Sequence, residues 1–382
     1  PPDRETEPAS RDPRCQRRFR DGSSVSLTTA VVLHRREVRP VPHRFGDGPR
    51  GRPERGDDQG MNGTSESIAV DGIAPVPIEL LRERSPLNAS RLNRAWHRGE
   101  IIRIMPGVSA ESKRWQTLPP WARYLAHVHA VALKKPDAVF CGVSAAALRG
   151  VYLGRADEPV HVLEPLGSSR LAGRIRIHTG GHDRVIEEVG GTLLTGIPDT
   201  AVDVARSVPP IEGLAYVDAL LRRARDPRPD ELRAINESRE TSRGRRNARW
   251  ALERATGVPE SPLESLSLGV MEAAGFELPE LQVEFRLEGC VDRADFFWRS
   301  RRIIGEADGR IKYDGTLQDP MSAIMREKQR DSRLRRQASG LLHWGWSEVR
   351  DFAILTGILM SAGVPRPHRR DAALLATLRD LA

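Results

Sequence analysis

The sequence predicts a multidomain α+β protein. Its 382 residues are enough for two or three domains, and a hydrophobic content of 39% is enough for their cores. Helical periodicity and short alternating strand patterns follow one another from about residue 71 onwards, and the first 70 residues show neither. The predicted parts are residues 1–70, 71–112, 121–257, 258–352 and 353–382.

The charge balance favours a polyanionic partner. The chain has 60 basic and 52 acidic residues and a formal net charge of +8, which is typical of proteins that bind nucleic acid. Only five of the basic residues are lysine, and such an arginine bias is also expected from a GC-rich genome, which weakens the charge argument.

Cysteine usage and hydropathy indicate the compartment. The three cysteines are far apart and form no CxxC pair, so neither a disulfide framework nor a zinc site is indicated, and a reducing cytoplasm is the simplest location. No apolar run approaches the roughly 20 residues of a membrane span, so no membrane partner is expected.

Residues 1–70 are rich in Arg, Asp, Pro and Gly and show no sustained periodicity. Such a segment cannot bury enough surface to offset chain entropy, so the sequence predicts disorder. Met61 precedes the first pattern typical of a fold. We hypothesise that translation starts at Met61 and that the upstream residues are an extension.

The part from 71 to 112 has the pattern of a small DNA-binding module. The spacing predicts a short helix over 78–82, a turn over 85–87, a second helix that Asn88 or Ser90 caps, and a hairpin over 101–110. This is a winged helix-turn-helix order, whose second helix could enter a major groove. The arginines that it would present to DNA are Arg91, Arg94 and Arg98. The alternative is a small structural subdomain with solvated arginines.

The middle part, 121–257, reads as a mixed α+β region without a catalytic constellation. Helices are expected over 122–134, 144–148, 199–206 and 216–224, and strands over 160–163 and 174–178. His127 and His129 are too close on one helix to face a common ligand, so core or surface roles are expected. The basic stretch 239–254 is expected to be helical, either as a solvated face or along a phosphate backbone.

Between 258 and 352 the order is helix, three strands, helix, strand. Ser261 suits the N-cap of the first helix, Pro262 its first position and Glu264 the acid of a capping box. Strands are expected over 281–287, 293–298, 303–308 and 341–346, with a basic helix over 322–339. This is the order of a small α/β nuclease core.

Carboxylates gather on two of these strands. Asp295 lies on one, Glu306 and Asp308 lie on the next, and alternation should direct all three to one face. Acids that converge in this way repel one another unless a cation lies between them, so they are candidate metal ligands. Structural alternatives exist: Glu306 and Asp308 precede a Gly309 turn, and capping alone accounts for Glu264.

The motifs of this part resemble those of the restriction-endonuclease-like superfamily, in the branch related to very-short-patch repair endonucleases. They are Glu-Ser-Pro-Leu-Glu-Ser at 260–265, Arg-Ala-Asp-Phe-Phe-Trp at 293–298, Gly-Glu-Ala-Asp-Gly at 305–309 with Lys312-Tyr313, the helix segment 327–334 and His-Trp-Gly-Trp at 343–346. Residues 77–110 and the middle part resemble abortive-infection-type antitoxins of type IV toxin–antitoxin systems. The two resemblances cover most of the chain after Met61.

The nuclease resemblance implies a Mg²⁺ or Mn²⁺ centre. Asp295 and Glu306 would be metal ligands with Asp308 beside them, and Glu264 would be an additional carboxylate. The lysine that the superfamily places two residues after Glu306 is Asp308 here. Further candidates, which are all basic, are Lys312 or Lys328 for the missing charge and Arg330 and Arg333 for DNA contact.

Together these features predict a cytoplasmic DNA-binding protein with a metal-dependent endonuclease domain, of bacterial defence or toxin–antitoxin type. A cognate toxin is a candidate partner. The first alternative is an antitoxin-like transcriptional repressor whose nuclease fold has lost activity. The second is an interaction scaffold that contacts no nucleic acid.

Overall fold

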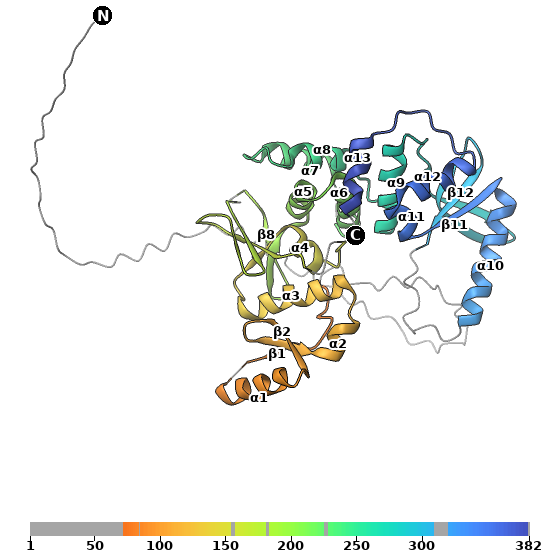
Figure 1. Ribbon diagram of the computed structural model, residues 1–382. Coiled ribbons are helices and arrows are strands. Elements are labelled where there is room, and N and C mark those ends of the chain that lie inside the picture. The colour runs from red at the N-terminus through yellow and green to blue at the C-terminus, as the bar shows by residue number, and fades with distance from the viewer. Residues whose placement is uncertain are drawn as a thin grey trace, which may run out of the picture. The chain divides into compact units, whose positions relative to one another are not determined.

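Three separate β-sheets organise the chain in the computed structural model (Figure 1). The structure describes residues 72–380, apart from 84, 154–156, 181–182, 225–227 and 309–319. All of these residues belong to one compact unit. The mixed α+β architecture is the class that the sequence predicts. The predictions for residues 1–70, including a start at Met61, lie outside the described residues.

The first sheet is antiparallel, with strand order β1-β3-β2. Its strands are β1 (Leu81–Arg82), β2 (Ile101–Met105) and β3 (Val108–Glu111), and its helices are α1 (Pro86–His97), α2 (Ser112–Thr117) and α3 (Pro120–Lys134). A small core joins the hairpin to α3, and its buried members are Ile78, Ile104, Val108, Ala110, Ala126 and Ala130. The hairpin expected over 101–110 is confirmed.

The prediction of a helix over 78–82 is wrong. Ile78 is buried in the core below the hairpin, and Leu81 pairs with Ser109 of β3. Long-range pairing with the hairpin therefore overrides the local helical pattern. The capping prediction for the next helix is also wrong by a few residues, because α1 begins at Pro86 and the Ser85 side chain accepts a hydrogen bond from the Asn88 backbone N–H at 3.2 Å.

The second sheet has six strands in the order β6-β7-β5-β4-β9-β8. They are β4 (Val139–Phe140), β5 (Val160–Glu164), β6 (Arg170–Ala172), β7 (Ile175–Thr179), β8 (Ile186–Val189) and β9 (Thr192–Thr195). The accompanying helices are α4 (Gly142–Leu148), α5 (Ile197–Ser207), α6 (Pro210–Leu221), α7 (Pro229–Ser238) and α8 (Arg245–Arg254). The expected helices and strands of this part are confirmed to within a few residues, except that the helix expected from 216 begins at Pro210 and the basic helix begins only at Arg245.

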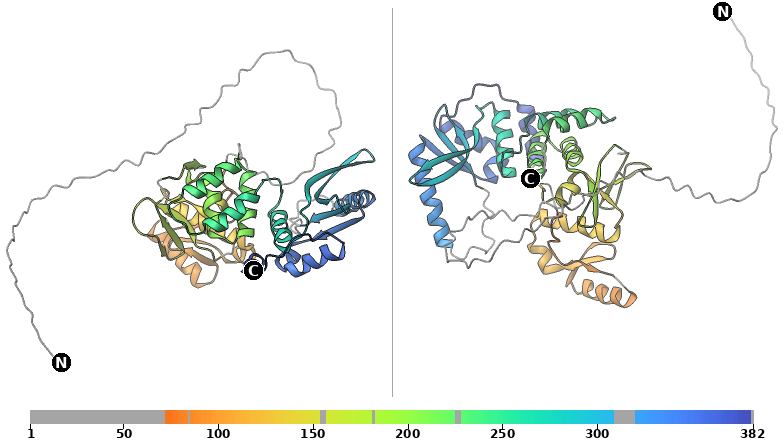
Figure 2. Two further views of the ribbon diagram at one scale, coloured as in Figure 1. Left: turned by 90° about the horizontal axis from the view of Figure 1, so that it is seen from above. Right: turned by 180° about the vertical axis from the view of Figure 1, so that it is seen from behind.

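The third sheet has the order β10-β11-β12-β13, antiparallel between the first three strands and parallel between the last two. Its strands are β10 (Glu280–Leu287), β11 (Cys290–Trp298), β12 (Ile303–Ala307) and β13 (Gly340–Trp344). The helices are α9 (Pro262–Ala274), α10 (Pro320–Gln337), α11 (Trp346–Arg350), α12 (Phe352–Ser361) and α13 (Ala372–Ala376), followed by a 3₁₀ turn, Thr377–Asp380. Figure 2 shows α9 and α10 beside this sheet. The predicted order of helix, three strands, helix and strand is confirmed.

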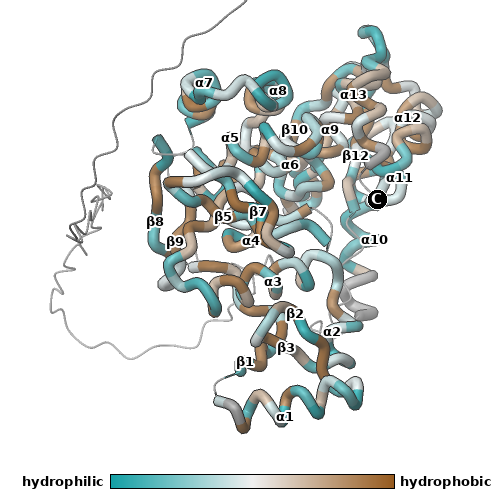
Figure 3. The backbone as a smooth tube through the Cα atoms, turned by 60° about the vertical axis from the view of Figure 1, so that its left-hand side comes forward, coloured by the Kyte–Doolittle hydropathy of each residue, from teal (hydrophilic) through white to brown (hydrophobic). Residues whose placement is uncertain are grey.

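Apolar side chains cover both faces of the third sheet. The α9-side core joins α9, the sheet and the C-terminal helices, and its largest members include Phe276, Phe296, Trp298 and Trp344. The smaller α10-side core consists of Ala294, Phe297, Ile304 and Leu334, the last of which lies on α10. Most of α10 is otherwise hydrophilic and is coloured teal in Figure 3. Among the described residues, no helix combines the length and the apolar character that crossing a membrane requires.

Capping residues define both ends of helix α9. The Ser261 hydroxyl accepts a hydrogen bond from the Glu264 backbone N–H at 3.2 Å, Pro262 begins the helix, and Gly275 ends it with a φ of 89°. These are the capping roles that the sequence predicts. Helix α9 also packs on α6, where a Cβ atom added at Gly269 would lie only 2.6 Å from Cγ2 of Ile211. The close packing of the two helices therefore depends on a glycine.

Candidate functional site

Asp295 and Glu306 come together where the pairing between β11 and β12 ends. The last ladder pair is Phe296 with Gly305. One step further, the backbone N–H of Ala307 donates to Oδ2 of Asp295 at 2.9 Å, so a side-chain carboxylate takes the place of a backbone acceptor. Asp295 is half-buried, and Glu306 is only 3% exposed. The two acids thus lie on adjacent strands within a largely apolar sheet.

The alternation of strand faces reverses at Gln282. This residue lies opposite Asp295 and has a φ of 52°, a left-handed conformation that costs energy for any residue other than glycine. Leu281 packs in the α9-side core, whereas Val283 packs in the α10-side core. Phe296 and Ala294 of β11 divide between the two cores in the same way. Strict alternation, from which the sequence predicts the orientation of Asp295, therefore does not hold on β11.

Gln282 joins two of the predicted carboxylates. Its Nε2 donates to Oε2 of Glu264 at 2.8 Å and to Oδ1 of Asp295 at 3.3 Å. Oε2 of Glu264 also accepts from the Glu260 backbone N–H at 2.8 Å. Glu264 therefore holds the segment before α9, and it is linked to Asp295 through Gln282. The capping box differs from the prediction, because the carboxylate accepts from the N–H of Glu260 and not from that of the N-cap residue Ser261. Gln282 was not predicted, because only its strained backbone and its place opposite Asp295 indicate it.

Glu306 is held by an arginine from α10. Nη2 of Arg330 lies 3.1 Å from Oε1 and 3.0 Å from Oε2 of Glu306, and it also donates to the backbone carbonyl of Arg293 at 2.6 Å. The Glu306 side chain is 4% exposed and the Arg330 side chain 32% exposed. The guanidinium thus covers the carboxylate and is itself accessible to solvent.

Asp308 pairs with a histidine. Nδ1 of His343 lies 2.7 Å from Oδ2 of Asp308, and Nε2 of His343 lies 3.4 Å from Oδ2 of Asp331 on α10. The hydrogen bond to Asp308 raises the pKa of His343 above its ordinary value. Glu306 and His343 are register partners on β12 and β13, so the imidazole lies beside the carboxylate cluster. His343 is a second residue that was not predicted to lie in the site.

The carboxyl groups are electrostatically strained. Burial raises the pKa of Glu264, Asp295 and Glu306, and the charge of Asp295 raises the pKa of the two glutamates further. Carboxylates whose ionised forms are destabilised by burial and mutual repulsion are suitable ligands for a hard divalent cation such as Mg²⁺ or Mn²⁺. Within the described residues, however, no three His, Cys, Asp or Glu side chains are grouped as a metal site. Each acid is instead held by a hydrogen-bond donor of the protein.

Glu306 should make the stability of the metal-free protein depend on pH. Burial raises its pKa to about 7. The folded state therefore retains a proton that the unfolded state releases near pH 4.5, so the free energy of unfolding falls as pH rises between these values, by at most about 1.4 kcal/mol per unit. Urea titrations between pH 5 and 8 should show Glu306→Gln gaining stability relative to wild type up to about pH 7. Parallel pH profiles of the two proteins would contradict this assignment.

The other predicted residues of this part lie apart from the carboxylates or are not described. Arg333 is held by two hydrogen bonds to the buried Asp292, at 2.6 and 2.7 Å, so it stabilises the packing of α10 on β11. Lys328 is exposed on α10. Lys312 lies outside the described residues. Of the two lysines predicted to supply the missing positive charge, the described one, Lys328, therefore makes no contact with the carboxylates among the described residues.

Two of the predicted DNA-contacting arginines lie on α1, and the third, Arg98, is its C-cap residue. Arg91, Arg94 and Arg98 are all exposed, and no described side chain of α1 is fully buried. Arg98 forms a two-bond ion pair with Glu100, at 2.7 and 2.9 Å. The helix is held to the hairpin by Arg103, whose guanidinium lies 4.5 Å from the centroid of the Trp96 ring.

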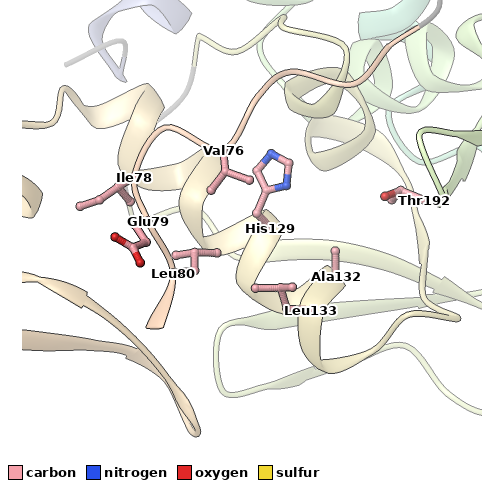
Figure 4. A pocket seen from close by; sticks show the side chains of 8 residues that line it. All are labelled: Val76, Ile78, Glu79, Leu80, His129, Ala132, Leu133 and Thr192. Carbon is pink, nitrogen blue, oxygen red and sulfur yellow. The ribbon is translucent and has the colours of Figure 1, made fainter. Parts of the chain in front are cut away.

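A separate hollow of about 490 Å³ lies between α3 and the segment that precedes β1 (Figure 4). It is lined by Val76, Ile78, Glu79, Leu80, His129, Ala132, Leu133 and Thr192. Its histidine has a structural role, because Nε2 of His129 lies 2.9 Å from the carbonyl oxygen of Ala74. The hollow therefore lacks a cluster of groups suited to catalysis. Of the core and surface roles expected of His129, its 6% exposure indicates the core role.

Two proteins of Mycobacterium tuberculosis are similar to this chain. They are uncharacterised protein MT2308 of strain CDC 1551 / Oshkosh and uncharacterised protein Rv2248 of strain ATCC 25618 / H37Rv. Each is 33% identical to the chain over 201 residues, which are 52% of the chain and 70% of the relative. The chain belongs to their family. No protein-family model matches the sequence of this member of the MT2308 and Rv2248 family, and no solved structure matches it. The names of the relatives state no activity, so function has to be argued from the site.

Proposed function

We propose that this protein is a metal-dependent nuclease that hydrolyses phosphodiester bonds in DNA. The observation that carries the proposal is the pair of acids Asp295 and Glu306, which meet on adjacent strands in a mostly apolar sheet. Burying two carboxylates beside each other costs stability, and the raised pKa of each one reflects that cost. A functional site accounts for a cost that packing does not require.

The arrangement of elements also supports a nuclease. Helix α9, three antiparallel strands, helix α10 and a parallel fourth strand follow in the order typical of the restriction-endonuclease-like core that the motifs resemble. Asp295 and Glu306 would hold Mg²⁺ or Mn²⁺, with Glu264 and Gln282 supporting Asp295. A bound cation of this kind polarises a phosphoryl oxygen and lowers the pKa of bound water.

The protein's own groups would orient the ligands. The Ala307 N–H and the Gln282 amide fix both oxygens of Asp295, and Arg330 fixes Glu306. Asp308 is engaged by His343, so we assign it to the surroundings of the metal ligands. Preorganised carboxylates reduce the reorganisation that substrate binding requires.

The decisive experiment is incubation of the purified full chain with supercoiled plasmid. Mg²⁺ or Mn²⁺ should produce nicked or linear DNA, and EDTA should prevent it. Single-stranded RNA of matched length, tested in parallel, defines the substrate class. Metal-independent binding without any cleavage would contradict the enzyme and support the alternative below.

A repressor with an inactive nuclease fold is the second candidate. It is favoured by the contact between Arg330 and Glu306, because this arginine already compensates the charge of the carboxylate without a metal. The aspartate at position 308 favours it too, since the resemblance places a lysine there. In that case α1 and the hairpin would carry the DNA-binding function.

Exposed arginines of α1 should contribute to DNA affinity through phosphate contacts. The double variant Arg91→Ala, Arg94→Ala should weaken DNA binding and lower the slope of log K against log salt by about 2, since each lost phosphate contact removes about 0.9. Arg98→Ala should change the slope less, because Glu100 already neutralises this guanidinium. Fluorescence anisotropy with a labelled duplex measures the slopes, at salt concentrations from about 50 to about 300 mM, which bracket the physiological value. An unchanged slope in the double variant would exclude α1 from the interface.

A further inference from the structure

Position 308 cannot supply a positive charge to the carboxylate cluster. The resemblance places a lysine there, two residues after Glu306, but the chain has an aspartate. Its carboxylate accepts a hydrogen bond from His343, with 2.7 Å between Nδ1 and Oδ2. If the proposed nuclease is active, the charge that develops on the phosphate has to be balanced from another element.

Arg330 brings a positive charge to the same place from α10. Its three hydrogen bonds, to both oxygens of Glu306 and to the carbonyl of Arg293, all use Nη2. One corner of the guanidinium is therefore fixed beside the carboxylate, and a third of the side chain remains exposed, at 32%. A phosphate oxygen near Glu306 could be bound through Nη1 or Nε without loss of the contact to Glu306.

Two neighbouring arginines of α10 pair with other carboxylates. Arg333 pairs with the buried Asp292, and Arg336 pairs with Glu288 at 2.7 Å. Arg335 is exposed between them. Among the arginines of α10 with a described partner, Arg330 contacts the carboxylate Glu306, one turn before Arg333.

We propose that Arg330 is the charge-stabilising residue of the nuclease site, and that it takes the role of the lysine absent from position 308. This inference rests on the proposed function. A guanidinium remains protonated at any physiological pH and has planar donors that match phosphate oxygens. Arg330 therefore stabilises negative charge and transfers no proton. A residue that only anchors DNA would affect DNA affinity, whereas Arg330 affects the rate of the chemical step.

The test compares Arg330→Ala, Arg330→Lys and Arg335→Ala, the last being a matched loss of charge on the same helix. Single-turnover cleavage of a labelled duplex at saturating Mg²⁺ should be about 100-fold slower or more in Arg330→Ala, as for the loss of one transition-state donor. Arg330→Lys should recover part of the rate, and Arg335→Ala should remain within about twofold of wild type. Thermal unfolding of each variant shows whether it is folded.

Two binding measurements separate catalysis from anchoring. DNA affinity, measured by anisotropy in EDTA, should change less than about threefold in Arg330→Ala, the size of one phosphate contact at moderate salt. Mn²⁺ affinity, measured by calorimetry without DNA, should not weaken, because the variant removes a cation that competes for Glu306. A rate loss matched by lost DNA affinity, weakened Mn²⁺ binding, or equal rates in Arg330→Ala and wild type would each overturn the proposal. If wild type itself cleaves nothing, the proposed function fails and this inference fails with it.

Discussion

Asp295→Asn is expected to lower the rate of metal-dependent DNA cleavage by about three orders of magnitude, because a metal ion contributes several kcal/mol of charge stabilisation. Asparagine has nearly the same size as aspartate and retains one oxygen that can accept from the Ala307 N–H. The fold should therefore persist while the negative charge of the ligand is lost. Glu306→Gln should have an effect of the same order.

The measurement is single-turnover cleavage of supercoiled plasmid with Mg²⁺ or Mn²⁺. Glu284→Gln is the matched control, because it makes the same change of carboxylate to amide at an exposed position of β10 in the same sheet. That control should remain within about twofold of wild type, as is usual for exposed charges. Cleavage by Asp295→Asn at the wild-type rate would remove Asp295 from the site and, with it, the main support for the proposed nuclease.

The second large effect is expected at Gly305, the residue before Glu306. A Cβ atom there would lie 2.5 Å from Cη2 of Trp344 and 3.1 Å from Cζ3 of Trp298. Neither ring can move easily, because the indole N–H of Trp344 donates to Ser267 at 2.8 Å and that of Trp298 donates to the carbonyl of Glu277 at 2.7 Å. Gly305→Ala should therefore lower the free energy of unfolding by about 3 kcal/mol, the upper range for overpacking a core.

Urea unfolding of the full chain, followed by tryptophan fluorescence, measures this loss. Gly340→Ala is the control, since it adds the same methyl group on the neighbouring strand β13, where the nearest atom, Cγ1 of Ile303, would lie 3.8 Å away. The control should stay within about 0.5 kcal/mol of wild type. Equal midpoints for the two variants would show that the indoles yield, and the packing argument would then be wrong.

Local patterns were sufficient for most of the secondary structure. Helix α9 followed from Ser261, Pro262 and Glu264, because capping groups act within one turn of the helix that they begin. Strands β11 and β12 followed from short apolar runs, and their acids were identified as site candidates from the sequence. In β1, by contrast, a helical pattern was overruled by pairing with β3, which no local pattern contains.

What the sequence determined by itself is the order of the elements and the presence of acids on two adjacent strands, since spacing and capping depend on nearby residues alone. Tertiary structure decided which groups meet those acids. Gln282, His343 and Arg330 reach the site from β10, β13 and α10, and each contact crosses 13 to 35 positions of the chain. Their approach depends on sheet register, a strained φ and helix packing. These are long-range properties, so the charge that replaces the expected lysine became visible only in the folded molecule.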